Sequence, residues 1–122
     1  MVTLSASTVT DAYGGWSCDG SATDNTAALT GGTTAGAAYG GHSNNGAVTG
    51  NTVAISGGTA NWVRGGDSET GAVTKNTVTI SGGTVECAQG GFTSINGAVK
   101  NNTVTLAGGT VKNGGVFGGD SG

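Results

Sequence analysis

Short runs of alternating polar and apolar residues recur along this chain at a nearly fixed interval. In the run Thr77-Val-Thr-Ile-Ser81, the two apolar residues share one face and the hydroxyl-bearing residues share the other. This two-residue period predicts a β-strand with one buried face. Similar runs follow an Asn at positions 25, 51, 76 and 102, so the interval is 26, 25 and then 26 residues. A period of this length predicts that each repeat is one turn of a stacked coil.

The rest of the repeat predicts two further strands. In the repeat that starts at Asn76, Gly82-Gly83 predicts a bend, and the residues from Thr84 to Gln89 predict a second strand. Another pair, Gly90-Gly91, predicts a second bend, which leads into a variable loop from Phe92 to Asn96. Gly97 to Lys100 predicts a third short strand. No part of the repeat has the 3.6-residue spacing of a helix.

Similar apolar residues occupy the same phase in successive repeats, which predicts parallel stacking. One turn cannot bury its apolar face alone, so neighbouring turns must cover it. Because crossovers between parallel strands are right-handed, we predict an all-β, right-handed parallel β-helix (β-solenoid) of about five turns with three short strands each. The chain is predicted to be one domain, 1–122, with turns of roughly 1–24, 25–50, 51–75, 76–101 and 102–122. The predicted inward ladders are Val53, Val78 and Val104; Leu4, Leu29, Ile55, Ile80 and Leu106; Val9, Val85 and Val111; and Val48, Val73 and Val99.

The composition excludes several classes of partner. Charged residues make up 9% of the chain, the net charge is −3 and there are four Lys and Arg residues, so no cluster of cations is available for nucleic acid or an anionic membrane. No apolar stretch approaches the ~18 residues of a membrane-spanning helix. The 27 glycines recur in register with Val, Ile and Leu, and proline is absent, which suits uninterrupted strand ladders.

The two cysteines predict neither a disulfide nor a metal site. Cys18 and Cys87 lie at different phases of the repeat, two to three turns apart, which is more than the ~7 Å between Cα atoms that a disulfide tolerates. Neither belongs to a CxxC pair, and the only histidine, His42, has a different phase. We therefore expect two free thiols, no metal and no cofactor.

The recurring asparagines predict a structural ladder. Stacked Asn side chains hydrogen-bond along the stack direction, as they do in other cross-β ladders. We interpret this column as stabilising the fold rather than binding a ligand. Its members are Asn25, Asn51, Asn76 and Asn102.

The motifs of the repeat resemble those of bacterial autotransporter adhesins and related secreted β-helix proteins. The resemblance is carried by Asn76-Thr-Val-Thr-Ile-Ser-Gly-Gly-Thr-Val85 and by a second motif, seen as Ala12-Tyr-Gly-Gly15, Ala38-Tyr-Gly-Gly41 and Val116-Phe-Gly-Gly119. It implies a non-enzymatic structural or adhesive module that is extracellular or on a bacterial cell surface. The sequence begins and stops within a repeat, so we expect its open ends to meet other copies, head to tail in filaments, or adjoining repeats of a longer chain.

An enzyme is not expected, because the acidic residues do not form a pair. Polysaccharide-cleaving β-helix enzymes need clustered carboxylates. Asp67 and Asp120 share a phase but lie two turns apart, and Asp11 and Glu86 lie three turns apart.

Two outward surfaces are candidates for binding. A loop ladder and an aromatic ladder are suited to a host-surface or polysaccharide ligand. The loop ladder consists of Trp16, His42, Asp67 and Phe92, and the aromatic ladder of Tyr13, Tyr39 and Phe117. For the tyrosines we favour packing between the glycine bends over binding. The alternative is an ice-binding (antifreeze) solenoid. Its outward Thr ladder would consist of Thr52, Thr77, Thr79, Thr103 and Thr105.

Overall fold

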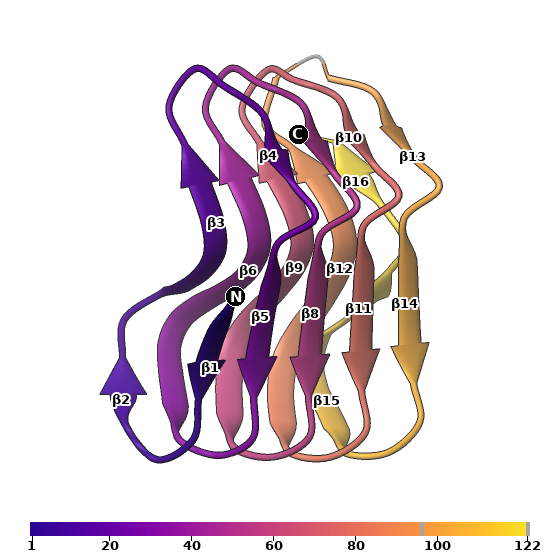
Figure 1. Ribbon diagram of the computed structural model, residues 1–122. Helices are drawn as coiled ribbons and strands as arrows, with labels where there is room; N and C mark the ends of the chain where they lie inside the picture. Colours follow the sequence, from indigo (N-terminus) through magenta and orange to yellow (C-terminus); the bar gives the residue numbers. More distant parts are fainter. Residues whose placement is uncertain (96, 122) are drawn as a thin grey trace.

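The computed structural model is a β-solenoid without a helix in the part of the chain that it describes, residues 1–95 and 97–121. The side chains of residues 35, 113, 114, 120 and 121 are outside that description, as is residue 96, where the predicted loop ends. The chain runs down the near side in Figure 1, passes behind and rises on the far side while advancing from the N-terminal to the C-terminal end. This is the predicted right-handed coil. It completes four turns and begins a fifth, slightly fewer than the five that we predicted.

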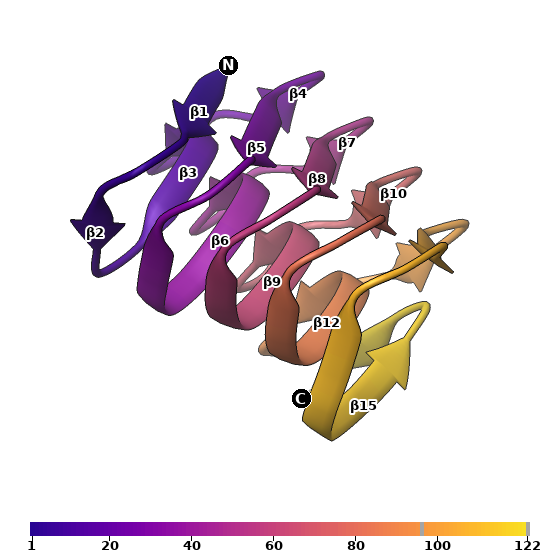
Figure 2. The same ribbon diagram turned by 90° about the horizontal axis from the view of Figure 1, so that it is seen from below.

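Three parallel sheets form the sides of the coil (Figures 1 and 2). The first sheet contains β1 (Val2–Leu4), β5 (Thr26–Leu29), β8 (Thr52–Ile55), β11 (Thr77–Ile80) and β14 (Thr103–Leu106). The second contains β2 (Thr8–Val9), β3 (Ala12–Ser17), β6 (Thr33–Ser43), β9 (Thr59–Ser68), β12 (Thr84–Thr93), β15 (Thr110–Phe117) and β16 (Asp120–Ser121). The third contains β4 (Ala22–Thr23), β7 (Val48–Thr49), β10 (Val73–Thr74) and β13 (Val99–Lys100).

The core contains the predicted apolar ladders, in the predicted register, and a further buried column of the second sheet that was not predicted, Ala38, Val63 and Ala88. Ile80 pairs with Ile55 on one side and Leu106 on the other, and its side chain is fully buried. Val78 lies in the neighbouring ladder and is equally buried. At the C-terminal end of this ladder, Leu106 has no turn beyond it and is 50% exposed, whereas Leu4 at the N-terminal end is buried. A smaller cluster around Val48 and Val73 fills the corner under the third sheet.

The prediction that Gly90-Gly91 and its equivalents bend the chain is wrong. β12 continues through both glycines to Thr93, and β6 and β9 continue likewise. The glycines are needed for space, because a Cβ on Gly66 would lie 2.5 Å from Asn76 Nδ2 and a Cβ on Gly65 would lie 2.6 Å from the carbonyl oxygen of Gly90. The pair therefore lets the second sheet pass close to the asparagines at the start of the next turn.

A different column of residues makes one corner of the coil. Asp24, Lys75 and Asn101 have φ values of 55°, 58° and 57°, and Gly50, at the same place, has a φ of 71°. Each precedes an asparagine of the predicted ladder. This left-handed conformation is readily adopted by Gly, Asn and Asp, so the column supplies a sharp change of direction between the third and first sheets.

The second turn is one residue longer than the third, and the two differ at an irregularity in the second sheet. The pairing of β6 with β9 shifts by one residue between Thr34 and Ala37. There the amide of Gly36 donates to the carbonyl of Thr10, and the amide of Ala37 donates to Oδ1 of Asp11. A bulge of this kind takes up an additional residue without disturbing the ladders on either side.

Candidate functional site

The asparagines form a continuous hydrogen-bonded column inside the coil, which we call the amide ladder (Asn25, Asn51, Asn76 and Asn102). In each step, the backbone amide and Nδ2 of one Asn both donate to Oδ1 of the next, at 2.9–3.0 Å. Nδ2 of Asn51 also donates to the carbonyl of Ala22, and Nδ2 of Asn76 to that of Val48. Asn51 and Asn76 are fully buried. The ladder therefore joins successive turns and ties the third sheet to the first, and its buried amides leave no surface for a ligand.

The predicted aromatic ladder is an outward column on the second sheet, in which the two tyrosine rings stack on each other and Phe117 lies apart from them. The rings of Tyr13 and Tyr39 lie 4.7 Å apart and are parallel to within 8°. The next residue in the column is Arg64, whose guanidinium carbon lies 6.0 Å from the Tyr39 ring and 4.1 Å from the Phe92 ring. Phe117 shares the register further along and is 44% exposed. The tyrosines thus use one ring face for each other, which is a structural contact.

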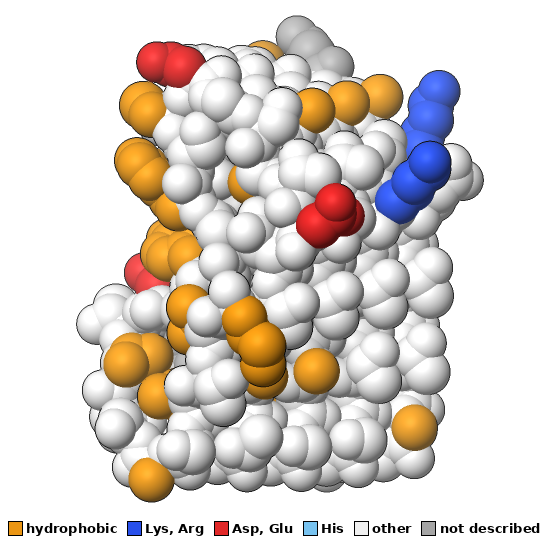
Figure 3. Space-filling model, in the orientation of Figure 1, with side chains coloured by type: hydrophobic (Ala, Val, Ile, Leu, Met, Phe, Trp, Pro, Cys, Tyr) orange, Lys and Arg blue, Asp and Glu red, His pale blue; other side chains and the backbone are white. Residues whose placement is uncertain are grey.

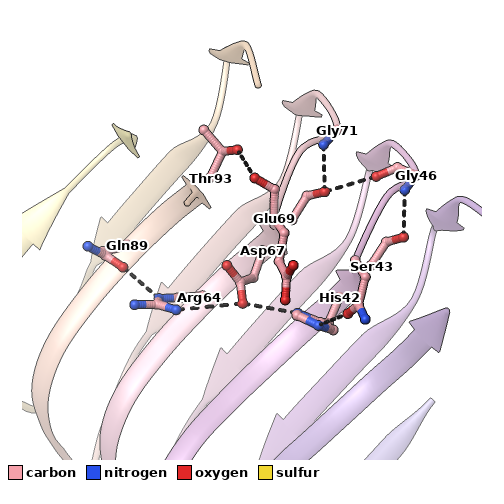
Figure 4. Close-up of polar contacts among 11 residues, drawn as sticks. His42, Ser43, Gly46, Arg64, Asp67, Glu69, Gly71, Gln89 and Thr93 are labelled. Atoms are coloured by element: carbon pink, nitrogen blue, oxygen red, sulfur yellow. Dashed lines mark hydrogen bonds and ion pairs between the residues drawn. The ribbon is translucent and has the colours of Figure 1, made fainter. Parts of the chain in front are cut away.

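Charged and amide side chains form a second outward line that crosses three turns, which we call the ionic row (Gln89, Arg64, Asp67, His42 and Asn44). Nε of Arg64 donates to Oε1 of Gln89 at 2.7 Å, and Nη1 lies 3.6 Å from Oδ2 of Asp67. The same oxygen of Asp67 lies 3.0 Å from Nδ1 of His42. Nε2 of His42 lies 3.1 Å from Oδ1 of Asn44. Figure 4 shows these side chains lying end to end from β12 to β6.

Burial and charge in the ionic row alter the pKa of its neighbours. The hydrogen bond to Asp67 raises the pKa of His42 above its usual value, against the opposing effect of partial burial. Burial, assisted by the negative charge of Asp67, raises the pKa of Tyr39 to about 12. The pKa of Tyr13 is also raised, first by burial and then by the negative charge of Asp11. The tyrosines therefore stay neutral, and the titrating group near neutral pH is the imidazole.

The structure brings the predicted loop ladder together but does not place it in loops. Trp16, His42, Asp67 and Phe92 pair in register within β3, β6, β9 and β12. The strands extend this far because they continue through the glycine pairs. Trp16 is 57% exposed, whereas Asp67 is buried. The carboxylate of Asp120, which shares this phase, lies outside the described side chains.

The predicted Thr ladder lies on the outer face of the first sheet. Thr52, Thr77 and Thr103 pair in register, as do Thr79 and Thr105. In the described strands of this sheet, every outward position is Thr or Ala, so the face carries no charge. Figure 3 shows the near surface over β5, β8, β11 and β14 without red or blue side chains.

Sequence reasoning missed the part of the ionic row that lies in the middle turns, together with Trp62. Arg64 and Gln89 replace the tyrosine of the second motif, so their departure from the pattern at one shared phase was the available signal. It also missed a column of buried hydroxyls beneath the loops. Ser43 Oγ donates to the carbonyl of Gly20 and accepts from the amide of Gly46, and Ser68 does the same one turn later (Figure 4).

Among the described residues, no three His, Cys, Asp or Glu side chains are grouped so as to hold a metal ion, and the surface that they form has no pocket. Both ion pairs found within this part of the chain share Asp67. Cys18 is exposed, Cys87 is buried, and the two thiols are not bonded to each other. No helix in the described ranges is long and apolar enough to cross a membrane.

Comparison of the chain with protein-family models, with curated proteins and with solved structures found no match.

Proposed function

We propose that this chain is a non-enzymatic structural or adhesive module of a secreted or cell-surface protein, and that its end faces add further turns. The observation that carries the proposal is the state of the core at the C-terminal end. Leu106 is 50% exposed and Val116 is 44% exposed, whereas Ile80 and Ala88, at the same phases one turn earlier, are fully buried.

These exposed residues belong to strands that lack a neighbour on one side. β14 is the last strand of the first sheet, and its backbone amides and carbonyls on that side are available for pairing. A further turn would cover both the apolar side chains and the strand edge. That turn can come from a second copy, stacked head to tail, or from an adjoining repeat of a longer chain.

Self-assembly is tested by light scattering and electron microscopy at increasing protein concentration. If copies stack, filaments grow with an axial repeat of about five turns, or ~24 Å. Leu106→Asp would place a charge on the end face and stop growth without disturbing an interior turn. Thr105→Asp, on the same strand but facing outward, is the matched control and should still assemble. A wild-type chain that stays folded and monomeric would contradict self-assembly and assign the end face to neighbouring repeats.

Ice binding is a second candidate, favoured by the uncharged Thr and Ala face of the first sheet. Adjacent threonines repeat there at about 4.8 Å along the stack and about 6.7 Å along a strand. A thermal-hysteresis assay tests it directly. Thr79→Lys, in the centre of the face, should abolish any activity, whereas Ser94→Lys on an exposed loop should leave it intact.

A polysaccharide ligand is a third candidate, favoured by the exposure of Trp16 (57%) and Trp62 (43%) on the second sheet. Exposed indole faces stack on sugar rings. Affinity electrophoresis in gels containing soluble polysaccharides should show retardation that is reduced in Trp16→Ala and Trp62→Ala. Equal mobility of all three proteins would count against it.

A further inference from the structure

His42 is the only histidine in the chain, and it contacts residues of the first three turns. It lies on β6, in the second turn. Its ring faces Trp16 and Tyr13 on β3 of the first turn, and it hydrogen-bonds Asp67 on β9 of the third turn. Among the described residues, its partner Asp67 takes part in every ion pair. His42 is therefore placed to join three turns through one side chain.

Both ring nitrogens of His42 face oxygen acceptors. Nδ1 lies 3.0 Å from Oδ2 of Asp67, and Nε2 lies 3.1 Å from Oδ1 of Asn44. The amide nitrogen of Asn44 is directed to Sγ of Cys18, at 3.9 Å, which leaves its oxygen for the histidine. A neutral imidazole has one N–H and can satisfy only one of these acceptors, whereas the imidazolium donates to both. The geometry thus matches the protonated ring.

Three aromatic rings surround the same imidazole. The Trp16 ring lies 6.3 Å away, nearly parallel, and the Tyr13 and Tyr39 rings lie 5.8 and 5.7 Å away at steeper angles. Electron-rich rings attract a cation within about 6 Å, a range that includes both tyrosines and that Trp16 slightly exceeds. A proton on His42 therefore strengthens its contacts with the tyrosines of the first and second turns.

The charges that face His42 from the neighbouring elements are few. From the third turn, Asp67 is the hydrogen-bonded anion, and Glu69 adds a more distant negative charge that also raises the pKa of the ring. Arg64 is the opposing cation, and it shares Oδ2 of Asp67. Tyr13 and Tyr39 stay neutral because their pKa values are raised. Asn44, on the loop after β6, is uncharged and leads to the thiol of Cys18. Anionic neighbours dominate, so protonation lowers the local electrostatic energy.

We propose that His42 is a proton-operated clamp between turns, which closes in acid by binding Asp67, Asn44 and the aromatic rings at once and loosens when the ring loses its proton. The inference concerns these described contacts alone and does not depend on whether the chain is structural, adhesive or ice-binding.

The direction of the effect follows from the pKa. His42 has a folded-state pKa raised above its unfolded value of about 6.5, so its stabilising contribution is complete below pH 6.5 and is lost as the pH rises through the folded value. A pKa difference of one between the folded and unfolded chain corresponds to about a tenfold change in the folding equilibrium constant.

The clamp is tested first by proton NMR titration of the histidine Cε1–H, which gives a single unambiguous signal in this chain. The wild-type midpoint should lie above 6.5, and Asp67→Asn should lower it. Glu69→Gln is the matched control, because it removes a negative charge without touching the hydrogen bonds and should lower the midpoint less. A wild-type midpoint at or below 6.5, or one that Asp67→Asn leaves unchanged, would overturn the proposal.

A second readout reports the contact with the first turn. In a Trp62→Phe background, Trp16 is the only indole, and a protonated imidazole beside it quenches its fluorescence. Emission should rise with pH at the midpoint found by NMR, and His42→Gln should abolish the step. If Asp67→Asn does not fold, Asn44→Ala on the outer loop serves instead, and it should lower both midpoints together. Emission that does not change between pH 5 and 9 would contradict the contact between Trp16 and the protonated His42 ring.

Discussion

The amide ladder and the ionic row both join the second, third and fourth turns, but they are built on opposite principles. The ladder lies inside the coil and repeats one neutral residue, whose amide donates and accepts in every step. The row lies on the outer side of the second sheet, with Asp67 and Gln89 buried within it, and uses a different residue at each position, with charges that alternate between Arg64, Asp67 and His42. An amide both donates and accepts, so a ladder can repeat one residue type, whereas an ion-paired row requires complementary types.

The largest expected effect breaks the ladder at its centre. Asn76→Ala removes the oxygen that accepts from both the amide and the Nδ2 of Asn51, and Asn51 is fully buried. The buried amide of Asn51 loses its acceptor and the carbonyl of Val48 loses the bond from Nδ2 of Asn76, whereas Nδ2 of Asn51 keeps its bond to Ala22. Each buried polar group left without a partner costs about 1–3 kcal/mol, so the free energy of unfolding should fall by about 3 kcal/mol or more. Urea denaturation measures the loss. Asn45→Ala, whose Nδ2 bonds Asp19 on the surface, should change it by less than about 0.5 kcal/mol, and an equal effect would refute the distinction.

The next effect tests the close approach that the ladder demands. Gly65→Ala would put a Cβ 2.6 Å from the carbonyl oxygen of Gly90 and 3.1 Å from Cβ of Asn76, so backbone must move at a cost of about 1–3 kcal/mol. Gly118 has the same phase in the last turn, where the nearest atom to an added Cβ is 3.6 Å away. Thermal melts should show Gly118→Ala close to wild type. A large loss in that variant would mean that the glycines serve backbone conformation rather than space.

Removing one buried polar group, which belongs to neither the amide ladder nor the ionic row, should stabilise the protein. Thr34 lies in the apolar column between Val9 and Ala60, and its hydroxyl is buried without a hydrogen-bond partner. Thr34→Val has nearly the same shape and removes the unsatisfied hydroxyl, so it should raise the free energy of unfolding by about 1 kcal/mol. Thr34→Ser keeps the hydroxyl, removes a methyl group and should destabilise. A Val variant less stable than wild type in urea would contradict the assignment.

The smallest effect belongs to the ionic row. Arg64→Met keeps an apolar stem against Phe92 but gives up the bonds to Gln89 and Asp67. Asp67 retains His42 and the guanidinium is partly exposed, so we expect a loss of about 1 kcal/mol or less, a fraction of that in Asn76→Ala. The difference in stability between Arg64→Met and wild type should shrink in high salt, because Arg64 is partly exposed. A loss of unfolding free energy as large as that of Asn76→Ala would show that the ionic row stabilises the fold as much as the amide ladder does.

The fold was predictable from the sequence because its strongest determinant repeats. Val78 and Ile80 alternate with threonines, and the same pattern recurs at each Asn, which specifies strands, parallel pairing and register together. The role of the glycine pairs was not predictable, since Gly signals a bend and a close approach equally well, and only the packing of Asn76 over Gly66 distinguishes them.

The candidate site was predictable only in part. The phases of Tyr13, Tyr39, Trp16 and His42 gave the correct columns. The bond between His42 and Asp67 depends on side-chain directions near the end of β9. The predicted strand stopped at the glycine pair, before Asp67, so this bond was not predictable. Arg64 belongs to the same group, and periodicity marks it only as a departure from the tyrosine of its column, without indicating its partners.

The direction of the inter-turn hydrogen bonds has a mechanical consequence. In every sheet, the hydrogen bonds between strands of successive turns run along the axis of the coil. A tensile load applied to the two ends therefore pulls one end turn away at a time, rather than shearing all strands at once. We expect the molecule to lengthen in steps under such a load, each releasing one repeat of 25 residues, as between Asn51 and Asn76. A step of that size corresponds to roughly 85 Å of extended chain. The coil would then lengthen in increments of similar size, one for each turn that unfolds.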